Sequence, residues 1–172
     1  MRAEYDCFYL SASMFQMDWL SKCFKFNHCY DPLGRPIFWC RFEHFQPVAN
    51  TEREVVRFLC YTMDNVAYNM KPNVDQYVMV YDFNNTGYSN FSKSHTQDIL
   101  KFLQIVYCDR QYKTFIMRLP WIANGIKSVV MPFLHPRTAA KFNFLSSDWK
   151  ERLLQEFGAD NLPQEYGGNR EN

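Results

Sequence analysis

The apolar and polar residues of this chain alternate with two different periods, which predict strands and helices in turn. Phe24, Phe26 and His28 are separated by single polar residues, and residues 37–42 (IFWCRF) form a second apolar run. Between them, residues 30–34 (YDPLG) combine a proline and a glycine, which turns favour. An alternating run, a turn and a second run predict a β-hairpin.

Helical and strand patterns then alternate through the rest of the chain. Apolar residues recur every three or four positions from Val55 to Met70, and capping boxes at 51–54 (TERE) and 94–97 (SHTQ) predict two helix starts. A continuous apolar run at 77–81 (YVMVY) predicts a strand covered on both faces. The remaining predicted elements are helices at 99–107, 121–131 and 148–157 and strands at 113–119 and 142–144. This alternation predicts one α/β domain with a largely parallel sheet.

Composition and charge narrow the class of protein. The chain has 172 residues, which is the size of one domain, and a formal net charge of +1. That near-balance excludes a strongly basic nucleic-acid binder, whose affinity depends on many phosphate-neutralising cations. An apolar content of 47% excludes a disordered chain. Aromatic residues are unusually frequent at 18% and would suit a large apolar space, although composition alone favours a Phe-rich core.

The cysteines and the N-terminus predict a cytoplasmic protein with reduced thiols. The six cysteines include no C-x-x-C pair, and no histidine follows them at zinc-ligand spacing, so we expect no metal site. Glu4 and Asp6 stand where a secretory signal peptide needs a cationic start and an apolar run. No stretch approaches the roughly 18 apolar residues that a membrane-spanning helix needs.

Motifs of the common enzyme classes are missing. The six glycines build neither G-x-G-x-x-G nor G-x-x-x-x-G-K-[ST], so no nucleotide-phosphate loop is expected. No G-x-S-x-G elbow occurs. A triad could assemble only from scattered residues such as Ser94, His95 and Asp82, and Asp82 at a strand end is more typical of loop capping. We therefore expect no catalytic residue, no cofactor and no enzyme activity.

Positive charge concentrates between residues 109 and 141. That segment has six basic residues against Asp109 alone, a net charge of +5 in a chain of net +1. It also contains the most apolar predicted helix, at 121–131. An apolar helix flanked by basic residues is suited to contact with an anionic membrane surface, because the apolar residues can insert and the basic residues attract anionic lipids. An ordinary solvated surface fits the same pattern equally well.

Five segments, in order, resemble the CRAL-TRIO lipid-binding family. They are residues 30–36 (YDPLGRP), 80–83 (VYDF), 118–121 (RLPW), 131–141 (MPFLHPRTAAK) and 162–168 (LPQEYGG). The fourth is similar to the family's Lys-Pro-Phe-Leu-Asp-Pro-x-Thr-x-x-Lys segment, and the fifth matches its closing Leu-Pro-x-Glu-Tyr-Gly-Gly. Each motif alone is modest, but their order and spacing over about four-fifths of the chain make the resemblance strong.

The resemblance implies a mixed, mostly parallel β-sheet that forms the floor of a hydrophobic pocket, covered by helices and closed by a mobile gate helix. It implies a lipid-binding domain at 30–168 and a tail at 169–172. Residues 1–29 would be either a shortened form of the family's helical extension or the mark of a subgroup without one. The gate helix would present Trp121, Ile122, Ile126, Val129 and Val130, and the pocket would be lined by Tyr77, Met79, Tyr81, Phe115 and Met117.

The same resemblance implies the ligand and the residues that hold its headgroup. The family exchanges one whole hydrophobic molecule between membranes without catalysis, and its inositol-lipid binders use an acid, a threonine and a lysine. The matching residues are Asp109, Thr138 and Lys141, although Asp109 replaces a glutamate of the family. Tyr77 and Met79 are bulkier than the small hydroxyl residues of the choline-lipid binders, which argues against phosphatidylcholine. We therefore expect an inositol phospholipid and peripheral contact with anionic membranes.

An interaction module is the alternative function. Relatives that regulate small GTPases use the same fold as a protein-binding surface, in which case the chain would have a protein partner. The interior discriminates between the two hypotheses. An interior closed by Tyr77, Met79, Tyr81, Phe115 and Met117 would favour the scaffold, and an open one would favour lipid exchange.

Overall fold

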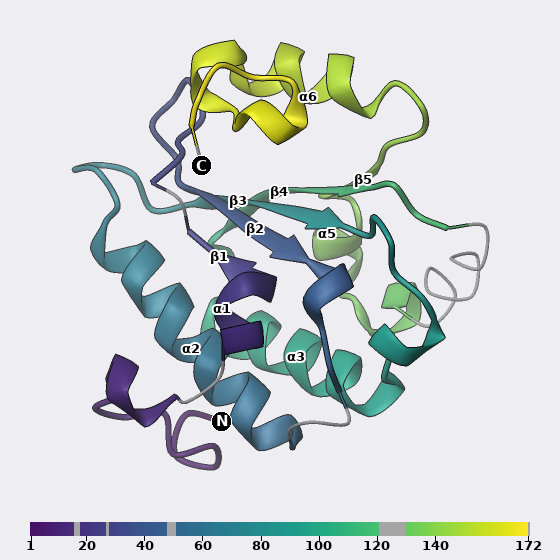
Figure 1. The fold of residues 1–172 in the computed structure, drawn as a ribbon. Coiled ribbons are helices and arrows are strands. Elements are labelled where there is room, and N and C mark those ends of the chain that lie inside the picture. Colours follow the sequence, from purple (N-terminus) through teal and green to yellow (C-terminus); the bar gives the residue numbers. More distant parts are fainter. Residues whose placement is uncertain (16–17, 27, 48–50, 121–129, 172) are drawn as a thin grey trace.

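The computed structural model describes residues 1–15, 18–26, 28–47, 51–120 and 130–171 (Figure 1). Within these residues the centre of the molecule is a five-stranded sheet in the order β1-β2-β3-β4-β5. The strands are Phe24–Lys25, Ile37–Arg41, Tyr77–Asp82, Gln111–Met117 and Phe142–Phe144. β1 runs antiparallel to β2, and every later neighbour pair is parallel. The predicted α/β class, with a mixed, mostly parallel sheet, is confirmed.

Helices cover both faces of this sheet (Figure 1). The described helices are α1 (Asp18–Cys23), α2 (Glu52–Tyr68), α3 (Lys93–Val106), α5 (Pro136–Ala139) and α6 (Trp149–Phe157). α2 and α3 lie against one face, and α6 lies against the other. None of the helices in the described part of the chain is long and apolar enough to cross a bilayer.

Side-chain capping sets the starts of the two long helices. Thr51 and Glu54 form the predicted capping box of α2: the Thr51 hydroxyl accepts from the Glu54 N–H, and the Glu54 carboxylate accepts from the Thr51 N–H. The predicted box at 94–97 is wrong. α3 is capped two residues earlier by Ser92, whose hydroxyl accepts from the His95 N–H.

The strand register decides which side chains share a face of the sheet. Met79 pairs with Thr114, and Tyr81 pairs with Ile116. Paired residues of neighbouring parallel strands point to the same side, because each strand alternates with period two. From Thr114 onward, even-numbered residues of β4 therefore share the α3 face with odd-numbered residues of β3. On the other face, Val78, Val80, Phe115 and Met117 pack against Leu153 and Phe157 of α6 in a separate apolar cluster.

A buried ion pair joins the ends of β3 and β4 on the α6 face. Asp82 is buried and accepts two hydrogen bonds from the Arg118 guanidinium and one of 3.1 Å from the Tyr166 hydroxyl. Asp82 also accepts from the Asn84 N–H at 2.9 Å, which confirms its predicted capping role. His95 lies instead on α3, with its ring against Phe45, so Asp82 and His95 do not form a triad.

The N-terminal residues are fastened to the ends of α2 and α3. The Arg2 guanidinium donates two hydrogen bonds to the Asp64 carboxylate, at 2.9 and 2.5 Å. The Tyr107 hydroxyl donates to the same carboxylate at 2.7 Å. Cys7 is buried in the core cluster on this side of the sheet. The first residues of the chain thus contribute to the core that supports α2 and α3.

Candidate functional site

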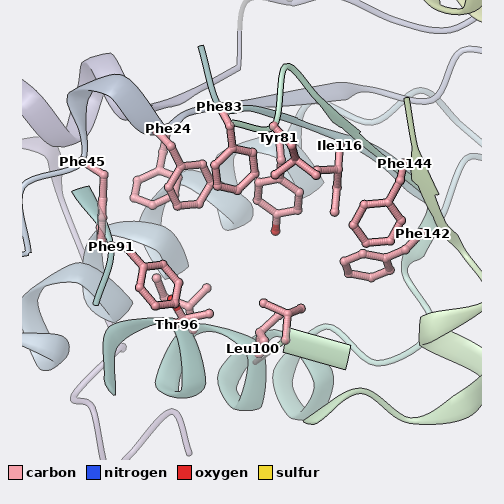
Figure 2. Close-up of a pocket in the computed structure, with 14 residues that line it drawn as sticks. Phe24, Phe45, Tyr81, Phe83, Phe91, Thr96, Leu100, Ile116, Phe142 and Phe144 are labelled. Atoms are coloured by element: carbon pink, nitrogen blue, oxygen red, sulfur yellow. The ribbon is translucent and has the colours of Figure 1, made fainter. Parts of the chain in front are cut away.

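An apolar cavity lies between the sheet and α3, and its volume is about 70 Å³ (Figure 2). Side chains of the sheet, such as Tyr81 and Ile116, point toward Thr96 and Leu100 of α3 across this space. Its described lining is almost wholly apolar: Phe24, Phe42, Phe45, Tyr81, Phe83, Phe91, Thr96, Ile99, Leu100, Ile116, Leu119, Val130, Phe142 and Phe144. The aromatic excess of the sequence therefore serves both a packed core and the wall of a hollow.

Ring-on-ring packing builds one side of this cavity. The Phe42 and Phe83 rings stack with their centroids 4.4 Å apart, and Phe24 meets Phe45 edge to face at 6.3 Å. Such geometries stabilise aromatic pairs beyond the burial of their area, by about 0.5–1.5 kcal/mol. The wall brings together β1, the short 3₁₀ helix at Phe42–His44 and the loop after β3. Three segments distant in the sequence thus form one continuous apolar surface.

Tyr81 brings a polar group to the cavity. Its hydroxyl donates to the Met79 thioether at 3.6 Å, and a thioether is a weak acceptor. Burial raises the pKa of Tyr81 well above its ordinary value, so the hydroxyl stays neutral. The Thr96 hydroxyl, by contrast, donates to the Ser92 carbonyl oxygen at 2.8 Å. Tyr81 can therefore offer a hydrogen bond to an oxygen of an otherwise apolar ligand.

A polar pocket of about 310 Å³ lies beside the apolar cavity, between the end of α3, the start of β4 and the α5 segment. Leu100 lines the apolar cavity, and Leu103, one helical turn later, lines the polar pocket. Likewise Phe142 lines the first and its chain neighbour Lys141 the second. The polar pocket is lined by Leu103, Gln104, Tyr107, Cys108, Asp109, Gln111, His135, Arg137, Thr138 and Lys141.

All three predicted headgroup residues line this polar pocket. Asp109 is exposed and follows α3, whereas Thr138 and Lys141 are half-buried and come from α5 and the turn after it. The Lys141 ammonium donates to the Gln111 carbonyl oxygen at 2.6 Å, which leaves its other two N–H groups for another acceptor. The Thr138 hydroxyl bonds to no described residue. The fold thus brings together an acceptor, a hydroxyl and a cation from distant segments.

Four polar residues of the pocket were missed by the sequence reasoning: Gln104, Gln111, His135 and Arg137. Gln104 links α3 to the segment before α5, because its amide donates to the Phe133 carbonyl oxygen at 2.9 Å and accepts from the His135 N–H at 3.0 Å. His135 and Arg137 belong to the motif at 131–141, and this motif, together with the charge of Arg137, was the signal available in the sequence. The glutamines carried no such signal.

The predicted pocket lining is wrong in part. The register pairs Tyr81 with Ile116, so Ile116 shares the cavity face with Tyr81. Its neighbours Phe115 and Met117 therefore point to the opposite side of the sheet, where they pack against α6. Tyr77 and Met79 do lie on the α3 face, but they are buried in the core cluster and do not line the cavity. Tyr81 alone of the five lines it.

The predicted gate helix falls largely outside the described residues. Trp121, Ile122, Ile126 and Val129 lie there, so their position is not described. Val130 is described, and it lines the apolar cavity. The gate therefore remains a prediction, with one of its residues at the cavity wall.

The basic segment at 109–141 does not form a single charged patch among its described residues. Arg118 is paired with the buried Asp82 on the α6 face. Lys113 forms a salt bridge of 2.6 Å with Glu156 of α6. Arg137 and Lys141 line the polar pocket on the other side of the sheet. The excess positive charge is thus distributed between the two faces, and only part of it lies near the candidate site.

Comparisons with known proteins agree with this architecture. The family model described as "CRAL/TRIO domain" matches residues 20–168. A CRAL-TRIO domain-containing protein of Schizosaccharomyces pombe is 23% identical over 149 residues, which cover 87% of this chain and 33% of that protein. A CRAL-TRIO domain-containing protein of Saccharomyces cerevisiae is 26% identical over 161 residues, covering 84% of this chain and 51% of that protein.

A solved structure shows the same fold. The crystal structure of Sfh5 matches with a TM-score of 0.78 at 16% identity, covering 97% of this chain and 61% of Sfh5. The SEC14 cytosolic factor of Yarrowia lipolytica is 24% identical and is covered over 32% of its length. The chain thus spans about half, or less, of the length of the curated relatives named here.

The described residues thus form an α/β domain in which a mostly parallel sheet and α3 border an apolar cavity, with a polar pocket beside it. The chain belongs to the CRAL/TRIO domain family. Proteins of this family, which includes the Sec14-like proteins, generally bind and transfer lipids and are generally not enzymes.

Proposed function

We propose that this protein binds one inositol phospholipid and transfers it between membranes. The observation that carries the proposal is the meeting of Asp109, Thr138 and Lys141 in one polar pocket that adjoins an apolar cavity. The acyl chains would enter the apolar cavity, and the headgroup would occupy the polar pocket. No catalytic step is part of this proposal.

The chemistry of the polar pocket suits an inositol headgroup. A carboxylate at Asp109 accepts hydrogen bonds from ring hydroxyls. The Thr138 hydroxyl can donate or accept, and the two remaining N–H groups of Lys141 can donate to a phosphate oxygen. Charge-assisted hydrogen bonds of this kind are roughly twice as strong as neutral ones. A choline headgroup has no ring hydroxyl for Asp109 and Thr138, although its phosphate could still accept from Lys141.

The apolar cavity must widen to hold acyl chains. Its volume of about 70 Å³ is well below the roughly 300–1,000 Å³ of ordinary ligand pockets. Each CH₂ group of an acyl chain that is buried in the cavity is stabilised by about 0.8 kcal/mol relative to water, and the bilayer interior provides the same stabilisation. The lipid therefore has nearly the same free energy in the bilayer and in the protein. The rate of transfer would then be set by the movement of the part of the cavity wall that admits the lipid. The gate of Trp121, Ile122, Ile126, Val129 and Val130 is the proposed moving wall.

The proposed place of action is the cytoplasmic surface of membranes. The named relatives include a SEC14 cytosolic factor, and the described helices include no membrane span. Membrane contact would be peripheral, with anionic lipids attracted by cations such as Arg110 and Arg137, which form no salt bridge with a described residue. Lipid pick-up at a membrane surface requires no more than this transient contact.

Lipid content and transfer test the proposal directly. Mass spectrometry of an organic extract of the purified protein should find one phospholipid per protein, and that lipid should be an inositol lipid. In a transfer assay between vesicles, labelled phosphatidylinositol should move faster than labelled phosphatidylcholine. Thr138→Val should slow phosphatidylinositol transfer, whereas Lys150→Gln on α6 should not. Failure to hold or move any lipid would refute the proposal.

A protein-binding module of the same fold is the second candidate, and the small cavity favours it. Tyr77 and Met79 pack in the closed core, as a scaffold with a reduced pocket would require. Replacing Ile116 by Trp would fill the cavity from β4. If that variant folds and loses lipid uptake, the cavity is the binding site. If the protein never takes up lipid but binds a small GTPase equally with either residue, the scaffold function holds.

A further inference from the structure

We propose that the polar pocket contains a subsite for a phosphate monoester, formed by Arg137 and His135, so that the preferred headgroup is an inositol ring with an added phosphate. This inference rests on the proposed function and narrows its ligand class. The two residues line the same pocket as Asp109, Thr138 and Lys141. They are additional to the three headgroup residues and have no role toward an uncharged ring.

The polar pocket offers one cation more than the proposed function uses, because Lys141 is there assigned to the phosphodiester and Arg137 to nothing. Arg137 and Lys141 are cations, and Asp109 is the only carboxylate among the described residues that line the pocket. Neither cation forms a salt bridge with a described residue, and the Arg137 guanidinium donates no hydrogen bond to one. The phosphodiester of phosphatidylinositol is an anion that Lys141 can bind, and its inositol ring is neutral, so the unphosphorylated lipid leaves Arg137 without an anion. An added phosphate monoester carries a charge of about −1.5 to −2 at neutral pH. The guanidinium fork can bind two of its oxygens at once.

The His135 ring is held as a hydrogen-bond donor. Its Nδ1 accepts from the Arg137 N–H at 3.3 Å. In the neutral ring the proton therefore lies on Nε2, because one imidazole nitrogen accepts and the other donates. The Nε2–H can donate to an anionic oxygen without protonation of the ring. A carboxylate at this position would instead repel a phosphate.

The backbone around these residues is fixed before any ligand arrives. Gln104 holds the chain on both sides of Leu134, through the Phe133 carbonyl oxygen and the His135 N–H. The His135 carbonyl oxygen accepts from the Thr138 N–H at 2.8 Å and from the Ala139 N–H at 2.9 Å. A turn tied in this way presents the side chains of 135, 137 and 138 from one short segment. Preorganisation of this kind reduces the cost of binding.

Vesicle co-flotation tests the subsite. Vesicles would contain phosphatidylinositol, phosphatidylinositol monophosphate or phosphatidylserine, the last two at equal total charge. We expect the monophosphate to bind about tenfold more tightly than phosphatidylinositol, the scale of one charged hydrogen-bonded contact. Arg137→Gln and His135→Asp should each remove this preference while phosphatidylinositol binding stays. Arg152→Gln, an exposed arginine on α6, is the matched control and should keep it.

The outcomes separate this inference from the function on which it rests. If the monophosphate and phosphatidylinositol bind equally, or if Arg137→Gln keeps the preference, the subsite is refuted and lipid binding stands. If phosphatidylserine binds as well as the monophosphate, general charge attraction replaces the subsite. If no inositol lipid binds, both proposals fail. A soluble inositol phosphate that displaces the protein from monophosphate vesicles supports the subsite. Comparing its affinity with that of the vesicles shows whether the protein prefers the free or the lipid-borne phosphate.

Discussion

The Lys141 ammonium donates a hydrogen bond to the carbonyl oxygen of Gln111 at 2.6 Å, across the start of β4. A second bond runs beside it, from the Thr114 N–H to the Lys141 carbonyl oxygen at 2.9 Å. Lys141 therefore braces the entry to β5 as well as lining the polar pocket. We expect its substitution to affect stability and, under the proposed function, lipid binding as well, so the two effects must be measured separately.

We expect Lys141→Ala to lower the free energy of unfolding by about 1–2 kcal/mol, because it removes a charge-assisted hydrogen bond and leaves the Gln111 carbonyl oxygen without it. Urea denaturation measures this change. Lys150→Ala on α6 is the control and should change stability by less than about 0.5 kcal/mol. Equal stability of the Lys141 variant and the parent would show that the bond does not brace β5.

The Asp82–Arg118 pair should be strongly coupled. Asp82→Ala leaves the Arg118 guanidinium and the Tyr166 hydroxyl without their carboxylate, and we expect a loss of about 3 kcal/mol. The double variant Asp82→Ala/Arg118→Ala should lose less than the two single losses added together, because the unpaired cation is gone. A double-mutant cycle by chemical denaturation measures this. Additive losses would mean that the pair contributes no coupling.

Stability in acid should depend on Asp64. Burial raises the pKa of this carboxyl, but hydrogen bonds from Arg2 and Tyr107 outweigh burial and hold the folded pKa below the ordinary value of 3.8. A carboxyl with a lowered folded pKa stabilises the fold above its unfolded pKa, and that contribution is lost as pH falls through the folded pKa. Asp64→Asn should therefore lower the urea midpoint at pH 6 more than at pH 3. The same difference at both values would contradict this assignment.

Gly168 is required by its surroundings. A Cβ at this position would lie 2.0 Å from the Leu162 carbonyl oxygen, which is backbone and cannot rotate away. We expect Gly168→Ala to destabilise the protein by more than about 2 kcal/mol through this overlap. Gly87→Ala is the matched control, because the nearest atom to its Cβ is 4.0 Å away. Thermal unfolding of both variants tests this, and a shift at position 87 as large as that at 168 would count against it.

Much of the fold and part of the site could be predicted from local pattern. The hairpin turn at 30–34 and the apolar runs of β2 and β3 stand in the structure as the alternation predicted, since period and turn chemistry are local properties. Asp109, Thr138 and Lys141 were predicted from motif resemblance as headgroup residues, and the structure shows that they line one pocket. The start of α3 was misplaced by two residues because Ser92 and Ser94 are equally good caps in the sequence alone.

The sequence by itself determined the α/β class, the family and the segments proposed to hold a headgroup, because these depend on spacing along one chain. Only the tertiary structure decided which side chains line the hollow. The alternation within each strand divides its residues into two sets on opposite faces. Which set of one strand shares a face with which set of the next depends on the register, and here Tyr81 pairs with Ile116. That one pairing puts Phe115 and Met117 under α6 and gives the cavity wall to Ile116 and Phe144, through contacts between segments that no local pattern records.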